Sequence, residues 1–292
     1  MAETTPTDGD PPTRDAATVV ILREGAAGPE VFCVERHSRS RFLAGAIVFP
    51  GGKVDECDHH AAWSELATPL GARSLSLGQG DSLARALAVA ALRESLEEAA
   101  LLATAGRDLV GSEVEGLRAE LRGADARGPG PLHDALRARG LRLDTARLEG
   151  FARWITPTFE PRRFDTRFYL LIAPEAQEGR HDDEETTRGF WARPADVLER
   201  WARGELQLAP PTSYTLERFA PATSVEEARR IARRESLAPL LPALLDDGGT
   251  SMLTLPGDRL HPTPPLPDRA PSLPTRFVLE AGRFVARHAP LP

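Results

Sequence analysis

The sequence predicts a fold that mixes α-helices and β-strands, and three observations support this fold class. Short runs rich in β-branched and aromatic residues, which favour strands, occur at 17–22, 31–34, 151–155 and 168–172. An Ala-rich segment at 82–103 has the composition of a helix. Clusters of glycine and proline, such as the one at 49–52, separate such segments as turns. With 292 residues, 41% of them apolar, the chain is long enough for one large domain or two small ones.

The N-terminal part begins with a polar segment and continues as strand and turn. Residues 1–15 carry almost no side chains that folding would bury, so we expect a disordered tail. The runs at 17–22 and 31–34 flank Gly28-Pro29 and predict a hairpin. Residues 59–80 are expected to form an insert, anchored by Trp63 and Leu66, that precedes the helix at 82–103.

The remaining segments predict more helices than strands. Ser112 and Glu115 have the spacing of a capping box and predict the start of a helix. A second short helix is expected at 132–139, so that residues 104–148 form a small helical subdomain. Strands at 151–155 and 168–172 enclose an arginine-rich loop. Further expected elements are helices at 194–202, 212–219 and 225–245, and a closing hairpin at 277–279 and 284–286.

The composition excludes several classes of function. A net charge of −7 and a pI near 5.6 argue against non-specific binding to nucleic acid or to anionic membranes. The apolar run Ala86–Leu92 is too short to span a bilayer, and neither a signal peptide nor a C-terminal peroxisomal signal is expected. Two cysteines, Cys33 and Cys57, favour a reducing compartment, and we expect a cytoplasmic protein.

Three carboxylates in the Ala-rich helix form the first candidate site. Glu94 lies three residues before Glu97 and four before Glu98, so all three side chains share one face of a helix. Like charges at this spacing repel each other, and a divalent cation bound between them removes the repulsion. Oxygen ligands suit magnesium (Mg²⁺) or manganese (Mn²⁺). The alternative is an ordinary solvated charged face, which is the more frequent explanation for such a pattern on its own.

A second motif makes the metal site the better interpretation. Gly52 follows Phe49-Pro50-Gly51 and is separated by five residues from Asp58, and the helix supplies Arg93 ahead of its glutamates. Together these residues resemble the Nudix box, in which a glycine turn precedes a helix with the pattern REUxEExGU, where U is a bulky aliphatic residue. Asp58 stands where the pattern has Glu, Ala100 replaces its glycine, and 34 residues instead of seven separate Asp58 from Arg93.

The long spacer is typical of one branch of this family, the branch that contains the peroxisomal coenzyme A diphosphatase. The chain is similar to that branch from about residue 16 to residue 260, including the segments 154–157, 161–168, 208–211 and 255–258. The resemblance implies an α/β/α sandwich with a mixed sheet. It also implies a Nudix domain at 16–205 with insertions at about 59–80 and 104–148, and a C-terminal extension at 206–292 packed on that domain.

The resemblance also assigns roles to the residues of the box. Glu97 and Glu98 are expected to ligate the metal, Glu94 to ligate it or to act as general base, and the carbonyl of Gly52 to complete the ligand set. Arg93 is expected to orient Glu97, with a simple ion pair within the helix as the alternative. We do not expect His59 and His60, in the insert, to bind the metal.

Candidate substrate contacts come from several arginines. Arg36 and Arg41 precede the glycine turn at spacings similar to a signature of coenzyme A-cleaving relatives, although the His of that signature is Leu43 here. A solvated basic loop is the alternative. Arg162, Arg163 and Arg167 suit phosphate, and we expect Arg163, or failing that Arg162, to bind a 3′-phosphate; neutralisation by Asp165 is the alternative. Glu185 is a further candidate for a metal or base contact, with a solvated acidic loop as the alternative.

The reaction implied is hydrolysis of a diphosphate that joins a nucleoside to a second moiety. Coenzyme A or an acyl-coenzyme A, cleaved to 3′,5′-ADP and (acyl-)4′-phosphopantetheine, is the first candidate substrate. The alternatives are a hydrolase of ADP-ribose, NADH or a related dinucleotide, and a catalytically silent module that binds a nucleotide and regulates another process. The expected partner is a small-molecule nucleotide, and a homodimer is compatible with the sequence.

Overall fold

A mixed eight-stranded sheet forms the centre of the molecule. The computed structural model describes residues 12–37, 45–182, 186–247, 250–263, 275–280 and 283–287. The strands of the sheet are β1 (Thr13–Gly25), β2 (Gly28–Arg36), β3 (Ala46–Val48), β4 (Gly51–Lys53), β7 (Glu149–Ile155), β8 (Arg163–Ile172), β9 (Thr186–Ala192) and β10 (Gln207–Leu208). Their order is β10-β3-β2-β1-β8-β7, with β4 paired to β1 and β9 to β2. The pairs β1·β8 and β3·β10 are parallel and the other pairs antiparallel.

The central strand β1 is buried on both faces, and this produces two separate cores. Val19 and Ile21 belong to one hydrophobic cluster, whereas Val20 and Leu22 belong to the other. Because consecutive side chains of a strand point to opposite faces, each cluster lies on one side of the sheet. The predicted hairpin is confirmed, since β1 and β2 pair from Leu22↔Val31 to Gly25↔Gly28.

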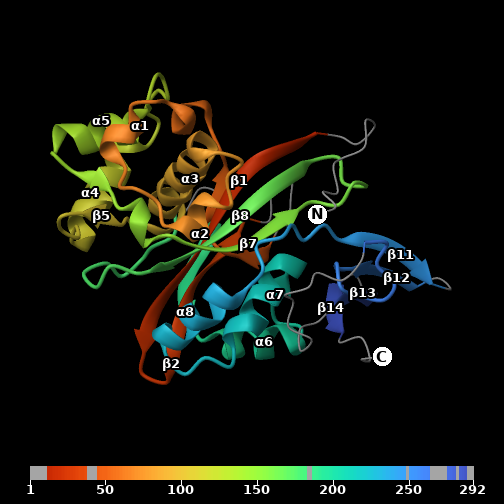
Figure 1. Cartoon of the computed structure of the whole chain (residues 1–292). Coiled ribbons are helices and arrows are strands. Elements are labelled where there is room, and N and C mark those ends of the chain that lie inside the picture. Colours follow the sequence, from red (N-terminus) through yellow and green to blue (C-terminus); the bar gives the residue numbers. More distant parts are fainter. Residues whose placement is uncertain are drawn as a thin grey trace.

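Helices cover the two faces of the sheet and complete a three-layer sandwich (Figure 1). On one face lie α1 (Trp63–Leu66), α2 (Ala72–Leu75), α3 (Asp81–Ala99), α4 (Gly111–Leu121) and α5 (Pro131–Ala138). The other face packs against α6 (Pro194–Ala202), α7 (Pro210–Phe219) and α8 (Val225–Arg234). A short ribbon of β5 (Thr104–Ala105) and β6 (Arg142–Leu143), and the 3₁₀-helices η1 (Glu56–His59) and η2 (Thr145–Arg147), lie among the helices of the first face. The expected α/β/α architecture is therefore confirmed.

A second, four-stranded sheet lies beside the sandwich (Figure 1). It contains β11 (Ala243–Asp247), β12 (Thr250–Thr254), β13 (Arg276–Glu280) and β14 (Arg283–Arg287), all antiparallel. Leu253 and Phe277 of this sheet pack in the same hydrophobic cluster as Val20 and Leu22 of β1. The closing hairpin is confirmed as β13–β14. The prediction of one helix over 225–245 was wrong, because α8 ends at Arg234 and residues 243–247 form β11.

Several boundaries differ from those expected. The strand β1 begins at Thr13, inside the segment expected to be a disordered tail. Helix α3 ends at Ala99, not at residue 103. Helix α4 begins at Gly111, and the side chain of Glu113, not Glu115, accepts a hydrogen bond from the backbone of Val110 at 3.0 Å.

The segment after residue 205 is in contact with the large sheet and its helices. Strand β10 pairs with β3 of the large sheet, and α7 and α8 pack in the same core as α6. The C-terminal extension expected at 206–292 therefore begins with elements that pack on the large sheet, and the division at 205–206 stays a prediction. No helix in the described part of the chain is long and apolar enough to cross a membrane.

Candidate active site

The glycine turn forms a strand that lies directly against the Ala-rich helix. Strand β4 pairs with β1 through Ala17↔Gly52 and Thr18↔Gly51. A Cβ atom added to Gly52 would lie 2.3 Å from Oε1 of Glu94, and one added to Gly51 would lie 2.4 Å from the carbonyl oxygen of Ala17. Gly51 therefore requires glycine, because the backbone of β1 approaches too closely for any side chain, whereas a side chain at residue 52 would displace the carboxylate of Glu94.

The three glutamates of α3 face this turn at different depths. Glu98 is 4% exposed, and its Oε2 accepts a hydrogen bond of 2.9 Å from the backbone N–H of Gly51. The side chain of Glu94 is 13% exposed and that of Glu97 44%. The expected shared face is thus present, with Glu98 at the bottom and Glu97 at the rim.

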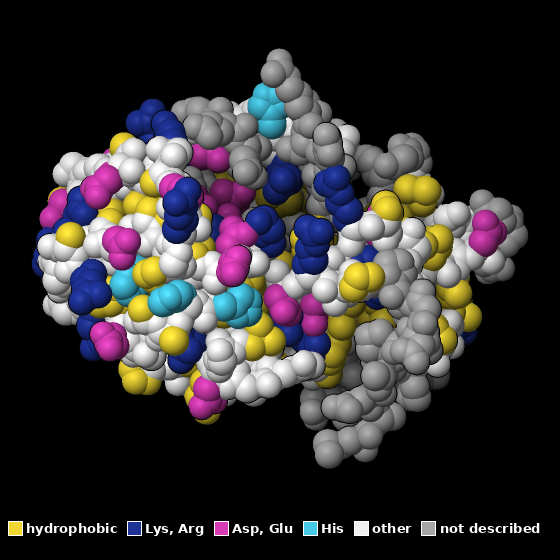
Figure 2. Space-filling view, turned by 90° about the horizontal axis from the view of Figure 1, so that it is seen from above, with side chains coloured by type: hydrophobic (Ala, Val, Ile, Leu, Met, Phe, Trp, Pro, Cys, Tyr) yellow, Lys and Arg dark blue, Asp and Glu magenta, His cyan; other side chains and the backbone are white. Residues whose placement is uncertain are grey.

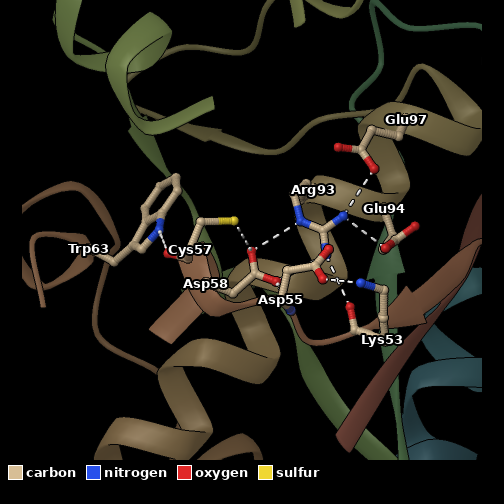
Figure 3. Close-up of polar contacts among 8 residues, drawn as sticks. All are labelled: Lys53, Asp55, Cys57, Asp58, Trp63, Arg93, Glu94 and Glu97. Atoms are coloured by element: carbon tan, nitrogen blue, oxygen red, sulfur yellow. Dashed lines mark hydrogen bonds and ion pairs between the residues drawn. The ribbon is translucent and has the colours of Figure 1, made fainter. Parts of the chain in front are cut away.

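The guanidinium of Arg93 lies between these carboxylates and the box segment before the insert (Figure 3). Its Nη1 donates to Glu94 Oε1 at 2.8 Å and to Glu97 Oε2 at 3.0 Å. Its Nε and Nη2 donate to the two carboxylate oxygens of Asp58 at 3.0 and 2.9 Å. Nη2 also donates to the carbonyl of Lys53 at 3.1 Å. The predicted contact with Glu97 is present, but it is one part of a larger network.

Asp58 holds the guanidinium of Arg93 from a buried position, a role that could not be assigned from the sequence. It lies in η1, is 1% exposed, and accepts a further hydrogen bond of 2.8 Å from the backbone N–H of Asp55. The fork of an arginine matches a carboxylate with two parallel bonds, which fixes both groups. Its place in the box spacing was the only sequence signal for this role. The shorter Asp at the position of the family's Glu still reaches Arg93.

Because the site gathers several carboxylates around the single guanidinium of Arg93, burial disfavours their charged forms. Burial raises the pKa of Glu94 to about 7, since the attraction of Arg93 is outweighed by desolvation together with the neighbouring charge of Glu97. Burial likewise raises the pKa of Glu97 above its usual value. Burial opposes the charge on Arg93, but Glu94 and Asp58 hold its pKa well above the usual range, so that it stays charged. A cation placed here would relieve the strain between the carboxylates.

The chemistry of the donors fits a hard divalent cation. Carboxylate oxygens and a backbone carbonyl are the ligands that Mg²⁺ and Mn²⁺ prefer, and Gly52 offers no side chain to block the approach. In the described residues no three His, Cys, Asp or Glu side chains are already gathered as a metal site. Glu94 and Glu97 instead turn toward Arg93. His59 and His60 are exposed in and beside η1, and the prediction that they do not bind the metal stays a prediction.

The expected substrate arginines are placed very differently from one another. Arg36 ends β2, and its buried Nε has no hydrogen-bond partner in the described part of the chain. Arg162 is exposed just before β8, whereas Arg163 is 4% exposed and donates through Nε to the carbonyl of Thr156 at 3.0 Å. Arg41 and the acidic candidate Glu185 lie outside the described residues.

Arg167 is an internal residue, so its position does not support the predicted contact with substrate. It is 1% exposed, and its Nη1 donates to Asp15 at 2.6 Å and to the carbonyl of Asp165 at 2.7 Å. Its Nε donates to the carbonyl of Leu77, at the end of the insert, at 3.2 Å. The last part of the stretch expected to be an arginine-rich loop, residues 163–167, belongs to strand β8, and alternation turns Arg167 into the interior.

Arg163 and Arg167 lie at the same end of the sheet as the glycine turn. Ala17 of β1 pairs with Gly52 on one side and with Arg167 on the other, and Thr13 pairs with Arg163. The start of β8 and strand β4 thus flank the same half of β1. Figure 2 shows acidic and basic side chains gathered around a hollow in the face seen from above.

A family model, curated relatives and a solved structure that resemble this chain all carry Nudix or NUDT19 names. The family model described as the NUDT19 Nudix domain matches residues 73–219, which include α3. The chain is 29% identical to the acyl-coenzyme A diphosphatase NUDT19 of Gallus gallus, covering 86% of this chain and 80% of the relative. It is 27% identical to the Homo sapiens protein of the same name, covering 81% and 73%. A crystal structure of a NUDIX hydrolase from Alicyclobacillus acidocaldarius is 34% identical, with a TM-score of 0.61 and coverage of 75% of this chain and 96% of that one.

Proposed function

The chain belongs to the Nudix hydrolase family, and we propose that it cleaves coenzyme A or an acyl-coenzyme A to 3′,5′-ADP and (acyl-)4′-phosphopantetheine. The observation that carries this proposal is the carboxylate face of α3 held against the Gly51-Gly52 turn. Every acidic position of the box is occupied, which favours an active enzyme over a silent nucleotide-binding regulator. The substrate follows from relatives that are named acyl-coenzyme A diphosphatases and align over 80% and 73% of their length.

Glu97, Glu98 and the carbonyl of Gly52 would hold Mg²⁺ or Mn²⁺, and Glu94 would either join them or act as general base. A divalent ion at this place neutralises the oxygens of the diphosphate and lowers the pKa of an attacking water. Burial raises the pKa of Glu94 to about 7 in the metal-free site, and a bound cation would lower it toward the carboxylate form that a ligand or a general base needs.

The remaining residues of the network position these groups. Arg93 restrains Glu94 and Glu97 to single orientations, and Asp58 in turn holds Arg93. The N–H of Gly51 fixes Glu98 at the bottom of the site. Glu98 is thus preorganised for the reaction, whereas Glu94 and Glu97 each keep one oxygen on Arg93 in the metal-free site.

Among the arginines, Arg162 is proposed to bind the 3′-phosphate of coenzyme A, and its exposure supports this choice. Arg163 was the first candidate, but it is buried and donates to Thr156, whereas Arg162 meets solvent at the same end of the sheet. Arg36 and Arg41 are proposed to contact the diphosphate, and Glu185 to add an acidic contact from its loop. An arginine fork suits a phosphate group in each case.

Two further aspects belong to the same proposal. Both cysteines, Cys33 and Cys57, are free and buried, which supports a reducing compartment such as the cytoplasm. The partner is a small-molecule nucleotide, and a homodimer is compatible with this assignment.

A substrate panel tests the proposal. Coenzyme A, an acyl-coenzyme A, dephospho-coenzyme A, ADP-ribose and NADH would be incubated with the full chain and Mg²⁺ or Mn²⁺, and the products separated by chromatography. We expect 3′,5′-ADP from coenzyme A at the highest kcat/KM of the panel. A preference for ADP-ribose or NADH would refute the substrate, and nucleotide binding without turnover would identify a silent regulator.

A further inference from the structure

Trp63, the first residue of α1, connects the two insertions to the active-site network. It is 1% exposed and lies in the core on the α3 side of the sheet. Its ring meets His133 of α5 edge to face, with ring centroids 5.2 Å apart and an angle of 87° between planes. On its polar side, the indole Nε1–H donates to the carbonyl of Cys57 at 3.0 Å (Figure 3).

The carbonyl that Trp63 binds belongs to the segment that carries Asp58. Cys57 and Asp58 are consecutive in η1, and the same carbonyl accepts a hydrogen bond of 3.2 Å from the N–H of His60. Two donors thus hold one peptide plane, and the next residue along the chain presents its carboxylate to Arg93. A shift of that plane would move Asp58, and with it the guanidinium that restrains Glu94 and Glu97.

From this continuous set of contacts we infer that Trp63 is a positioning residue for the metal site, acting through Cys57, Asp58 and Arg93. The inference rests on the metal site of the proposed function and gives the insert at 59–80 a part in it. Outer residues that orient ligands commonly change metal affinity by roughly 10- to 100-fold when they are altered. Trp63 lies one contact farther out than Asp58.

Trp63 also fills space in the core, and the test has to separate its N–H from its volume. Trp63→Phe removes the donor and keeps an aromatic ring between His133 and η1. Trp154→Phe is the matched control, because Trp154 is also buried, at 4% exposure, but its Nε1 has no hydrogen-bond partner among the described residues. The control loses the same atoms of a buried indole without breaking any hydrogen bond.

The experiment measures Mn²⁺ binding to the full chain without substrate, from the loss of the electron paramagnetic resonance signal of free Mn²⁺. We expect Trp63→Phe to raise the dissociation constant of Mn²⁺ about three- to tenfold. This is less than the roughly 10- to 100-fold typical of residues that contact a metal ligand themselves. Trp154→Phe should leave it within about 1.5-fold of the wild type, because its indole touches none of the groups that orient the carboxylates. An unchanged constant in Trp63→Phe, or equal shifts in both variants, would overturn the inference. Failure of the wild type to bind Mn²⁺ would instead refute the metal site itself.

A second measurement decides the matter if Trp63→Phe does not fold. Coupling between two sites is reciprocal, so a metal held through Asp58 must also steady η1 in the wild type. Amide hydrogen exchange of a peptide that spans residues 56–63 should slow when Mg²⁺ saturates the protein. Exchange that does not change with Mg²⁺, while metal binding is seen by another method, would contradict the role of Trp63.

Discussion

Replacing Asp58 by Asn tests whether the anchor of Arg93 stabilises both the fold and the site. Asn keeps the shape of Asp, but it loses the charge and turns one accepting oxygen into a donor that faces the N–H groups of Arg93. Both groups are buried: Asp58 is 1% exposed and the side chain of Arg93 11%. Breaking a buried ion pair costs about 3–5 kcal/mol. Arg93 keeps Glu94 and Glu97 as partners, so we expect a loss of about 3 kcal/mol in the free energy of unfolding.

Urea unfolding of the wild type and the variant measures this loss, and Mn²⁺ titration measures the effect on the site. We expect metal affinity to fall roughly 10- to 100-fold, since Arg93 would no longer be held in place. Asp125→Asn is the control, because Asp125 pairs with Arg127 at the surface, where the side chains are 67% and 88% exposed. Such a pair contributes at most about 1 kcal/mol. If Asp58→Asn changed stability as little as this control, the buried network would not have the importance given to it here.

Three further predictions concern single side chains. Glu98→Gln should retain the fold, because Gln can still accept from Gly51, yet lower kcat by about 100-fold or more through the loss of a metal ligand; a steady-state assay beside an unfolding curve separates the two effects. Arg162→Ala should cost about 1.5–3 kcal/mol in kcat/KM for coenzyme A and almost nothing for dephospho-coenzyme A. Equal losses on both substrates would place Arg162 elsewhere. Burial raises the pKa of Glu217 in α7 to about 7, so its protonated form is favoured in the folded state. Stability from this group is present below about pH 4.5 and is lost as the pH rises through 7, so Glu217→Gln should stabilise the protein by about 1–2 kcal/mol at pH 8 and not at pH 4. Unfolding curves that respond equally at the two pH values would contradict it.

The parts of the site that depend on local spacing could be predicted from the sequence. The shared face of Glu94, Glu97 and Glu98 follows from helix geometry, and the close approach at Gly52 follows from the absence of a side chain. The hairpin β1–β2 also has a local cause, in two strand-forming runs around a short turn. The end of α8 was readable as well, because Pro239 and Pro242 forbid a helix that continues to residue 245.

Contacts between distant segments could not be predicted in the same way. Arg167 is internal because Asp15 and the carbonyl of Leu77, which are 152 and 90 residues away in sequence, converge on it. Nothing in the pattern around residue 167 distinguishes this arrangement from an arginine that faces a ligand. Trp63 presents the same difficulty, since an anchoring role can be expected of a tryptophan in an insert, but its partner Cys57 cannot.

Ala100 shows how a departure from the family pattern is accommodated by neighbouring contacts. It ends α3 in the left-handed conformation, with φ of 51°, and it is the one non-glycine residue with positive φ in the described part of the chain. This conformation costs an L-residue roughly 1–2 kcal/mol relative to the right-handed one. The N–H of Ala100 donates to the carbonyl of Leu96 at 3.0 Å, and the hydroxyl of Ser95 donates to the carbonyl of Leu101 at 2.8 Å. These bonds hold the turn that the family's glycine adopts without strain, so the cost falls on stability while the carboxylate face keeps its place against β4.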